Sequence, residues 1–281
     1  MTAFQNRGVY QDDAHFAGQA PAGMLAATGR WTIASVQGFV RFVNIAVAVL
    51  WQSCRPLTWR RTVRAELFEQ CHQVGIRALP FILITGSLVG FGIVYQAIYW
   101  LGLFGQTEYI GPILVTVLVR EVAPLFVALI VIGRSGSVIL VELGNMQIDG
   151  QVRMLDAQGV DPFLFLIVPR VVAASVCMFS LTIAFITVAL GSGFLAGNAL
   201  GSMDFTLYDF VFRILSDMGP ADFATIPLKT FTIGFVVSLI ACTTGLSVSG
   251  SRSDLLAELP RYVTKSALTA LLISILLTLL L

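Results

Sequence analysis

The chain has 281 residues, of which 57% are hydrophobic and only 12% are charged, and its formal net charge is +1. Soluble domains carry about 25% charged residues, so this composition favours a bilayer as the solvent, and the balanced charge gives no reason to expect nucleic acid. The four cysteines and two histidines show neither CxxC spacing nor a Cys/His or Ser/His/Asp constellation. We therefore predict no metal site, no cofactor in this chain and no enzymatic activity.

The amino-terminal part is predicted to lie outside the hydrocarbon. Residues 1–30 are polar and lack the basic-then-apolar pattern of a signal peptide, so we expect a disordered cytoplasmic tail. Residues 31–78 mix apolar and charged side chains, and Gln37, Arg41 and Asn44 interrupt their first apolar stretch. Interfacial amphipathic helices are expected here rather than a crossing.

Residues 79–281 are predicted to form an all-α membrane domain. A crossing helix needs about 20 residues, and five apolar stretches come near or exceed that length: 79–101, 112–132, 163–200, 226–246 and 263–281. Tyr95, Tyr99 and Trp100 near the end of the first stretch suit an interfacial aromatic belt. The third stretch is too long for one straight crossing, so we expect it to project beyond the bilayer or to break near Gly191 and Gly193.

Lysine and arginine are unevenly distributed among the connecting segments. There are eight before the first predicted span, and zero, three, one and three in the successive connections. Because cytoplasmic connections carry an excess of Lys and Arg, this alternation predicts a cytoplasmic amino terminus and a periplasmic carboxyl terminus.

Small residues recur at four-residue spacing, which lets helices approach closely. The runs are Gly86/Gly90, Gly193/Gly197/Gly201 and Gly234/Ser238/Cys242. They are interpreted as packing positions within one chain, with contact between two copies as the alternative.

Charged residues inside the predicted spans are the sharpest functional signal. Arg120 and Glu121 fall in the middle of the second span, where each costs about 2.5–3.5 kcal/mol and needs a partner or a wet cavity. They are either structural anchors that pair with other helices or, as we favour, part of a substrate cavity or gate. Lys229, near the start of the fourth span, either extends to the interface or has a functional role.

The polar stretch 133–161 is predicted to be a cytoplasmic loop. Val138, Leu140, Val141, Leu143 and Met146 alternate there with polar positions, as in a short helix that docks on another protein, whereas a solvated connecting loop is the alternative. Its GRSGS start is not followed by GK[ST], so it is no phosphate-binding loop. If ATP drives this protein, another chain binds the ATP.

Three stretches carry a resemblance to a known family: LVREVAPLFVALIVIGRSGSVILVELGNMQIDGQVRMLDAQGVDPFLFLIVPRVVA, the glycine run from Gly86 to Gly92, and IPLKTFTIGF. Through them the chain resembles the MlaE (YrbE-type) permeases of ABC transporters, which serve MCE-protein lipid transport systems. The similarity covers about residues 56–281.

The resemblance implies a homodimeric, non-catalytic permease in a bacterial inner membrane that moves lipid, usually phospholipid. It implies a separate ABC ATPase that binds ATP and Mg²⁺, a periplasmic MCE-domain protein and, in many relatives, a STAS-domain protein. Arg120 and Glu121 match the family's charged pair at the lipid cavity and Lys229 matches a functional lysine, and we add Tyr95 as a candidate cavity residue. The family's coupling helix is expected to include these residues: Arg134, Glu142, Leu143 and Met146. Ser274 stands where some relatives have an aspartate.

Two other functional classes remain open on the sequence. An ion-coupled secondary transporter is disfavoured because five spans give no even internal repeat. A membrane scaffold is the second alternative, in which the charged pair only holds an assembly together.

Overall fold

The computed structural model describes residues 24–53, 55, 61–105, 109–199, 207–248 and 250–280. It forms two compact units, Met1–Ala48 and Val49–Leu281. Helix α1 (Met24–Ser53) begins in the first unit before residue 31, so the last part of the predicted disordered tail is helical. The rest of that tail lies outside the described residues.

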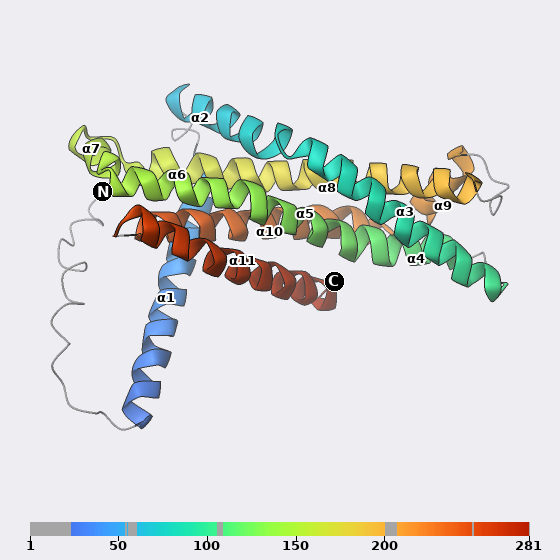
Figure 1. Cartoon of the computed structure of the whole chain (residues 1–281), viewed down its shortest axis with the longest axis horizontal. Helices are drawn as coiled ribbons and strands as arrows, with labels where there is room; N and C mark the ends of the chain where they lie inside the picture. Colours follow the sequence, from blue (N-terminus) through green and yellow to red (C-terminus); the bar gives the residue numbers. More distant parts are fainter. Residues whose placement is uncertain are drawn as a thin grey trace. The chain divides into compact units, whose positions relative to one another are not determined.

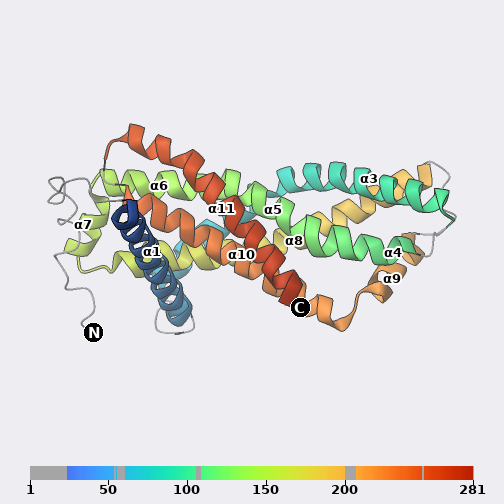
Figure 2. The ribbon, with the colours of Figure 1, turned by 90° about the horizontal axis from the view of Figure 1, so that it is seen from below.

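The second unit is a bundle of long helices, and the five predicted spans are confirmed (Figure 1). Helices long and apolar enough to cross a membrane run over Val63–Leu103, Ile110–Ile148, Phe163–Asn198, Pro220–Ser247 and Arg252–Leu280. Helix α8 (Val168–Ala199) packs on both α3 (Leu79–Leu103) and α10 (Pro220–Ser247), and α10 packs in turn on α11 (Arg252–Leu280). The turned view in Figure 2 shows α11 crossing α10 obliquely.

The first span also includes a segment predicted as interfacial. Helix α2 (Arg61–Cys71) and the π-helical η3 (His72–Ile76) precede α3 with little interruption. Val63, Gln70 and Val74 are buried in the bundle. This part of the chain is therefore helical and packed, while its depth at a membrane interface stays a prediction.

The second span continues into the segment 133–161 that was predicted as a loop with a short docking helix. This span, Ile110–Ile148, runs through α4 (Ile110–Ile113), η5 (Leu114–Val122), α5 (Ala123–Val131), η6 (Ile132–Gly136) and α6 (Ser137–Ile148). At 1.5 Å per residue this 39-residue helix is about 58 Å long, so it can project well beyond about 30 Å of hydrocarbon. Only the residues around the short α7 (Gln151–Ala157) form the chain reversal.

The later spans differ from prediction mainly at their ends. The third span, η7 (Phe163–Ile167) followed by α8, passes Gly191 and Gly193 without a break. Helices α10 and α11 both begin earlier than predicted. Helix α9 (Leu207–Asp217), which lies in a segment predicted as a loop, has one strongly apolar side.

Small residues bring the helices together within one chain. A Cβ on Gly90 of α3 would collide with the backbone of Ala189 on α8, and one on Gly193 would collide with Val94. On α10, a Cβ on Gly234 would lie 2.9 Å from Cβ of Met178. Packing within the chain, rather than contact between two copies, therefore explains these three glycines.

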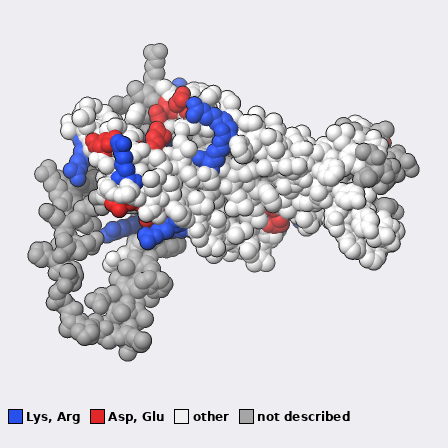
Figure 3. All heavy atoms as spheres, viewed as in Figure 1, with Lys and Arg blue, Asp and Glu red and all other residues white. Residues whose placement is uncertain are grey.

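Charged side chains gather at the end of the bundle formed by α6 and α7, and the visible surface beyond them is almost uncharged (Figure 3). Near this end, Arg170 of α8 is buried and lies 3.2 Å from Glu142 of α6 and 3.4 Å from Glu66 of α2. One buried guanidinium thus links three elements that are distant in sequence.

Replacing Gly90 with alanine should destabilise the bundle, because the new methyl group has no space against the backbone of Ala189. Overpacking of this kind costs about 1–3 kcal/mol. Gly92→Ala is the matched control, since nothing lies within 4 Å of a Cβ built there. Thermal unfolding of both variants in detergent should show a lower midpoint for Gly90→Ala alone, and equal midpoints would contradict the close α3–α8 contact.

Candidate ion-pair site within the bundle

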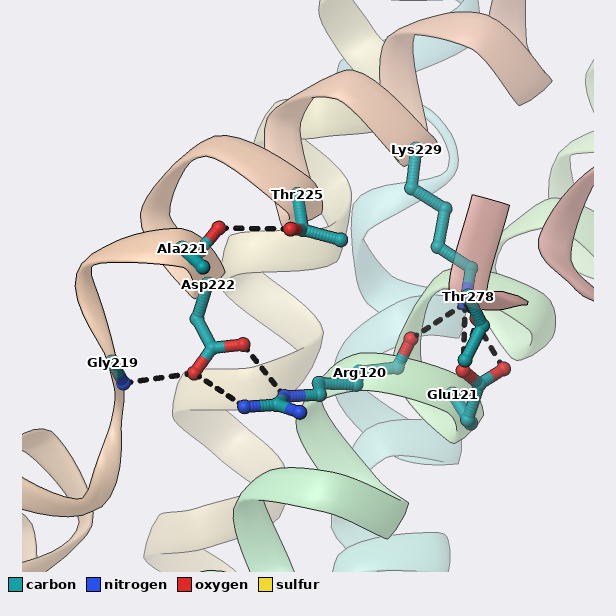
Figure 4. Close-up of polar contacts among 8 residues, drawn as sticks. All are labelled: Arg120, Glu121, Gly219, Ala221, Asp222, Thr225, Lys229 and Thr278. Carbon is teal, nitrogen blue, oxygen red and sulfur yellow. Dashed lines mark hydrogen bonds and ion pairs between the residues drawn. The ribbon is translucent and has the colours of Figure 1, made fainter. Parts of the chain in front are cut away.

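Arg120 and Glu121 are neighbours on the π-helical η5, yet their side chains point in different directions (Figure 4). Short π-helical segments inside α-helices are often found at functional sites. The Arg120 guanidinium lies beside the start of α10, whereas the Glu121 carboxylate lies between α10 and α11. The adjacent charges therefore belong to two separate clusters.

The first cluster is an ion pair between Arg120 and Asp222. Arg120 Nε lies 2.6 Å from Asp222 Oδ1, and Nη2 donates to Oδ2 over 2.8 Å. Asp222 is buried, and its Oδ2 also accepts from the backbone N–H of Gly219 over 2.9 Å. Because a carboxylate in the first helical turn satisfies free N–H groups, Asp222 both caps α10 and neutralises Arg120.

The second cluster joins η5, α10 and α11. Lys229 Nζ lies 2.9 Å from Glu121 Oε2 and donates to the hydroxyl of Thr278 over 3.0 Å. Thr278 donates to Glu121 Oε1 over 2.6 Å, and Ser274 donates to Oε2 over 3.2 Å. The Lys229 side chain is 2% exposed and that of Glu121 is 34% exposed. The ammonium of this network is therefore buried, whereas the carboxylate is partly exposed.

Pro124 explains how the backbone takes part in the second cluster. Proline has no N–H and so removes the α-helical bond to the carbonyl four residues earlier, which here belongs to Arg120. Lys229 Nζ donates to that carbonyl over 2.9 Å. The proline in REVAP thus leaves an acceptor for the buried ammonium, which needs several hydrogen bonds when it is out of water.

Arg120 and Glu121 pair with residues of other helices, as the alternative to a cavity role expected. The favoured role in a substrate cavity or gate stays a prediction. Lys229 does not extend to the interface, because its ammonium is buried and bonded inward. Tyr95 lies outside both clusters and stacks with Phe91 and Tyr99 along α3.

Sequence reasoning missed Asp222 and Thr278. Asp222 lies in the connection between the third and fourth predicted spans, and the Gly-Pro pair just before it was the available signal for a helix start. Thr278 gave no signal, because a lone threonine near the end of an apolar helix is common. Ser274, noted only as a departure from relatives, proves to be a hydrogen-bond donor to Glu121.

The four candidate coupling residues are spread along η6 and α6. Arg134 lies 5.2 Å from the centre of the Phe81 ring, and Glu142 binds Arg170. Leu143 is fully buried inside the bundle, and Met146 is partly exposed. The buried position of Leu143 removes it as a direct contact for a second protein.

The described residues thus define a multi-span α-helical membrane protein with a buried polar network across three helices. In this part of the chain, no group of three or more His, Cys, Asp or Glu side chains is placed to hold a metal ion. The sequence profile of the family described as "Permease MlaE" matches residues 67–280. The chain belongs to the MlaE permease family.

Individual relatives agree with this assignment. The chain is 30% identical over 193 residues to "Protein TRIGALACTOSYLDIACYLGLYCEROL 1, chloroplastic" of Arabidopsis thaliana, and the match covers 68% of this chain and 53% of that protein. It is 29% identical over 190 residues to "Probable ABC transporter permease protein slr1045" of Synechocystis, covering 68% and 72%. To the Haemophilus influenzae "Intermembrane phospholipid transport system permease protein MlaE" it is 33% identical over 131 residues, covering 47% and 50%.

Removing Glu121 should destabilise the bundle more than removing Lys229. Glu121→Ala leaves a buried ammonium without its counter-ion, which costs about 3–5 kcal/mol. Lys229→Met leaves a carboxylate that is partly exposed and can be hydrated, so its cost should be smaller. Glu258→Ala, which breaks an exposed pair with Arg261 on α11, should cost about 0–1 kcal/mol. Denaturant unfolding in detergent tests this order, and an equal or reversed order of the first two would contradict it.

Proposed function

We propose that this chain is the permease subunit of an ABC-type transporter that moves phospholipid between membranes. Its membership of the MlaE family and its likeness to ABC permeases support the class. The name of the Haemophilus influenzae relative, an intermembrane phospholipid transport permease, supports phospholipid as the cargo. In this proposal two copies form the permease in a bacterial inner membrane, with the amino terminus in the cytoplasm.

The proposed substrate path is based on the Glu121–Lys229 network. An ionic network inside a membrane helix bundle is costly and marks substrate or ion pathways. Here the carboxylate is 34% exposed although its partner is buried, so a polar lipid headgroup that reaches Glu121 can compete for its hydrogen bonds. We place this site in a cavity between two copies, lined by α3 and the second span, which closes when ATP is used.

ATP hydrolysis is assigned to a separate ABC ATPase with its Mg²⁺, and this chain is assigned the mechanical role. Coupling requires exposed contacts where the chain reverses between the second and third spans. With Leu143 buried, we place the contact on Met146 and on α7, where Met154 is 64% exposed. Arg170 then connects this end to α2 and α8 through Glu66 and Glu142.

The remaining partners follow from the family alone. We propose that a periplasmic MCE-domain protein receives or supplies the lipid, and that a STAS-domain protein accompanies the ATPase. Copurification from native membranes, followed by mass spectrometry of the proteins and the lipids, is the direct test of these assignments.

A variant that removes both charges of the second cluster should lose transport but keep the fold. Glu121→Gln with Lys229→Met leaves no buried charge unpaired, so the bundle should assemble with its ATPase. ATP-dependent lipid transfer between vesicles should fall at least about tenfold, equivalent to about 1.4 kcal/mol of activation free energy.

The double variant Glu258→Gln/Arg261→Gln, which removes an exposed ion pair of α11, is the control and should transfer lipid normally. Unchanged transfer by the Glu121/Lys229 variant would remove this pair from the substrate path. Transfer that needs no nucleotide and follows a proton or sodium gradient would instead favour a secondary transporter.

Shortening Met154 should weaken binding of the ATPase. Side chains at the centre of an interface can contribute about 2 kcal/mol or more, so Met154→Ala should lower the amount of ATPase that copurifies. Leu272→Ala on α11 is the matched control, because Leu272 is also 64% exposed. Equal ATPase recovery in both variants would exclude α7 as the coupling contact.

A further inference from the structure

An apolar cavity of about 590 Å³ lies between η5, α8, α9 and α10, outside the Glu121–Lys229 network. Its volume is in the range of about 300–1,000 Å³ that is typical of ligand pockets. Lining side chains from the four elements include Val119, Phe179, Leu190, Ile214 and Phe223.

The lining contains no ionisable residue. Its one hydroxyl, on Thr187, donates to the carbonyl of Ile183 over 2.9 Å, so it is already satisfied. A buried water needs about two to four polar partners, and the side chains of this lining offer only that one hydroxyl. The cavity therefore suits an apolar ligand.

The cavity is continuous with the apolar outer surface of the bundle. Ile183 and Phe223 belong to its lining and are also exposed large hydrophobic residues. A chain from the bilayer can thus enter sideways without removing water from a polar group. In addition, nothing lies within 4 Å of a Cβ built on Gly191, so the α8 wall has open space there.

The Arg120–Asp222 pair fixes the wall opposite α8. Val119 and Phe223 line the cavity, and each is the sequence neighbour of one member of the pair. Asp222 also holds the turn at Gly219 that connects α9 to α10. The first charged cluster therefore positions α9 over the cavity, while the second cluster faces α11.

We propose that this cavity binds one acyl chain of a membrane lipid. Its volume corresponds to about twenty groups the size of a water molecule, at roughly 30 Å³ each, which is the size class of a single chain of methylene groups. The inference builds on the proposed lipid transport, because it assigns one part of the lipid to a place in this chain. Arg120 is then a positioning residue for the acyl chain, and Glu121 acts at the headgroup.

Photo-crosslinking of the full chain in phospholipid vesicles tests the proposal. The probe is a phosphatidylethanolamine with a diazirine near the end of one acyl chain, and labelled residues are mapped by mass spectrometry. We expect labelling of residues 183–194 and 210–218 about tenfold above that around Val176, which is 44% exposed on α8 but lies outside the cavity. That ratio corresponds to about 1.4 kcal/mol of preferential binding.

Gly191→Phe fills the cavity and should bring its labelling down to the level at Val176. Gly102→Phe is the matched control, because a Cβ on Gly102 also meets nothing within 4 Å and Gly102 does not line the cavity. If Gly191→Phe does not fold, the ratio of labelling at the cavity to labelling at Val176 in the unaltered chain still tests the proposal.

Three results would overturn the proposal. Equal labelling at the cavity and at Val176 would mean that only ordinary bilayer lipid is in contact. Equal labelling of the cavity by a headgroup diazirine would mean that it holds a polar group. Loss of the signal when partner proteins are bound would assign the cavity to a partner's helix. Since labelling needs no ATP, failure of ATP-dependent transfer with labelling intact would overturn the proposed function and leave the acyl-chain site.

Discussion

The pairing of the buried Asp222, Lys229 and Arg170 side chains in the described part of the chain is the constraint on which this bundle depends. In hydrocarbon an unpaired charge is costly, so each intramembrane ion must meet a partner from another helix. Arg120 meets Asp222, Glu121 meets Lys229, and Arg170 meets Glu142 and Glu66. Since lipid tails are as apolar as the helix surfaces, the hydrophobic effect alone does not hold the helices together. These pairs and the close glycine contacts fix which helices meet.

The helix that carries Arg120 and Glu121 is irregular in a way that serves the site. Two π-helical segments, η5 and η6, interrupt the second span, and Pro124 follows the charged pair. A regular helix would commit the carbonyl of Arg120 to its own backbone. Here that carbonyl accepts from Lys229, so the backbone and the side chain of Glu121 together satisfy the buried ammonium.

In the proposed function, two neighbouring residues link two parts of a lipid path. Arg120 controls the start of α10 and the position of α9 over an apolar cavity, and Glu121 forms a half-open polar network with α10 and α11. A phospholipid has the same two parts, a polar headgroup and apolar chains. Movement of η5 would change the polar network and the apolar cavity at the same time. The proposed closure of the permease could thereby release the headgroup and the chains of one lipid together.

The sequence by itself determined the number of spans, because runs of apolar residues report length directly. It also determined that Arg120 and Glu121 need partners, because the cost of a charge in lipid does not depend on the fold. Its motifs indicated the family that the profile match then showed. At 133–148 the sequence predicted only a short helix within a loop, whereas the chain continues the second span as a helix that packs on α10 and α11.

Only the tertiary structure decided which partners are used. Asp222 is 102 positions from Arg120, and Thr278 is 157 positions from Glu121, so no local pattern connects them. The sequence likewise could not predict the burial of Leu143, the inward direction of the Lys229 side chain or the cavity beneath α9. Each depends on how helices rotate and cross, which is set by the shapes of the facing side chains rather than by the periodicity within one helix.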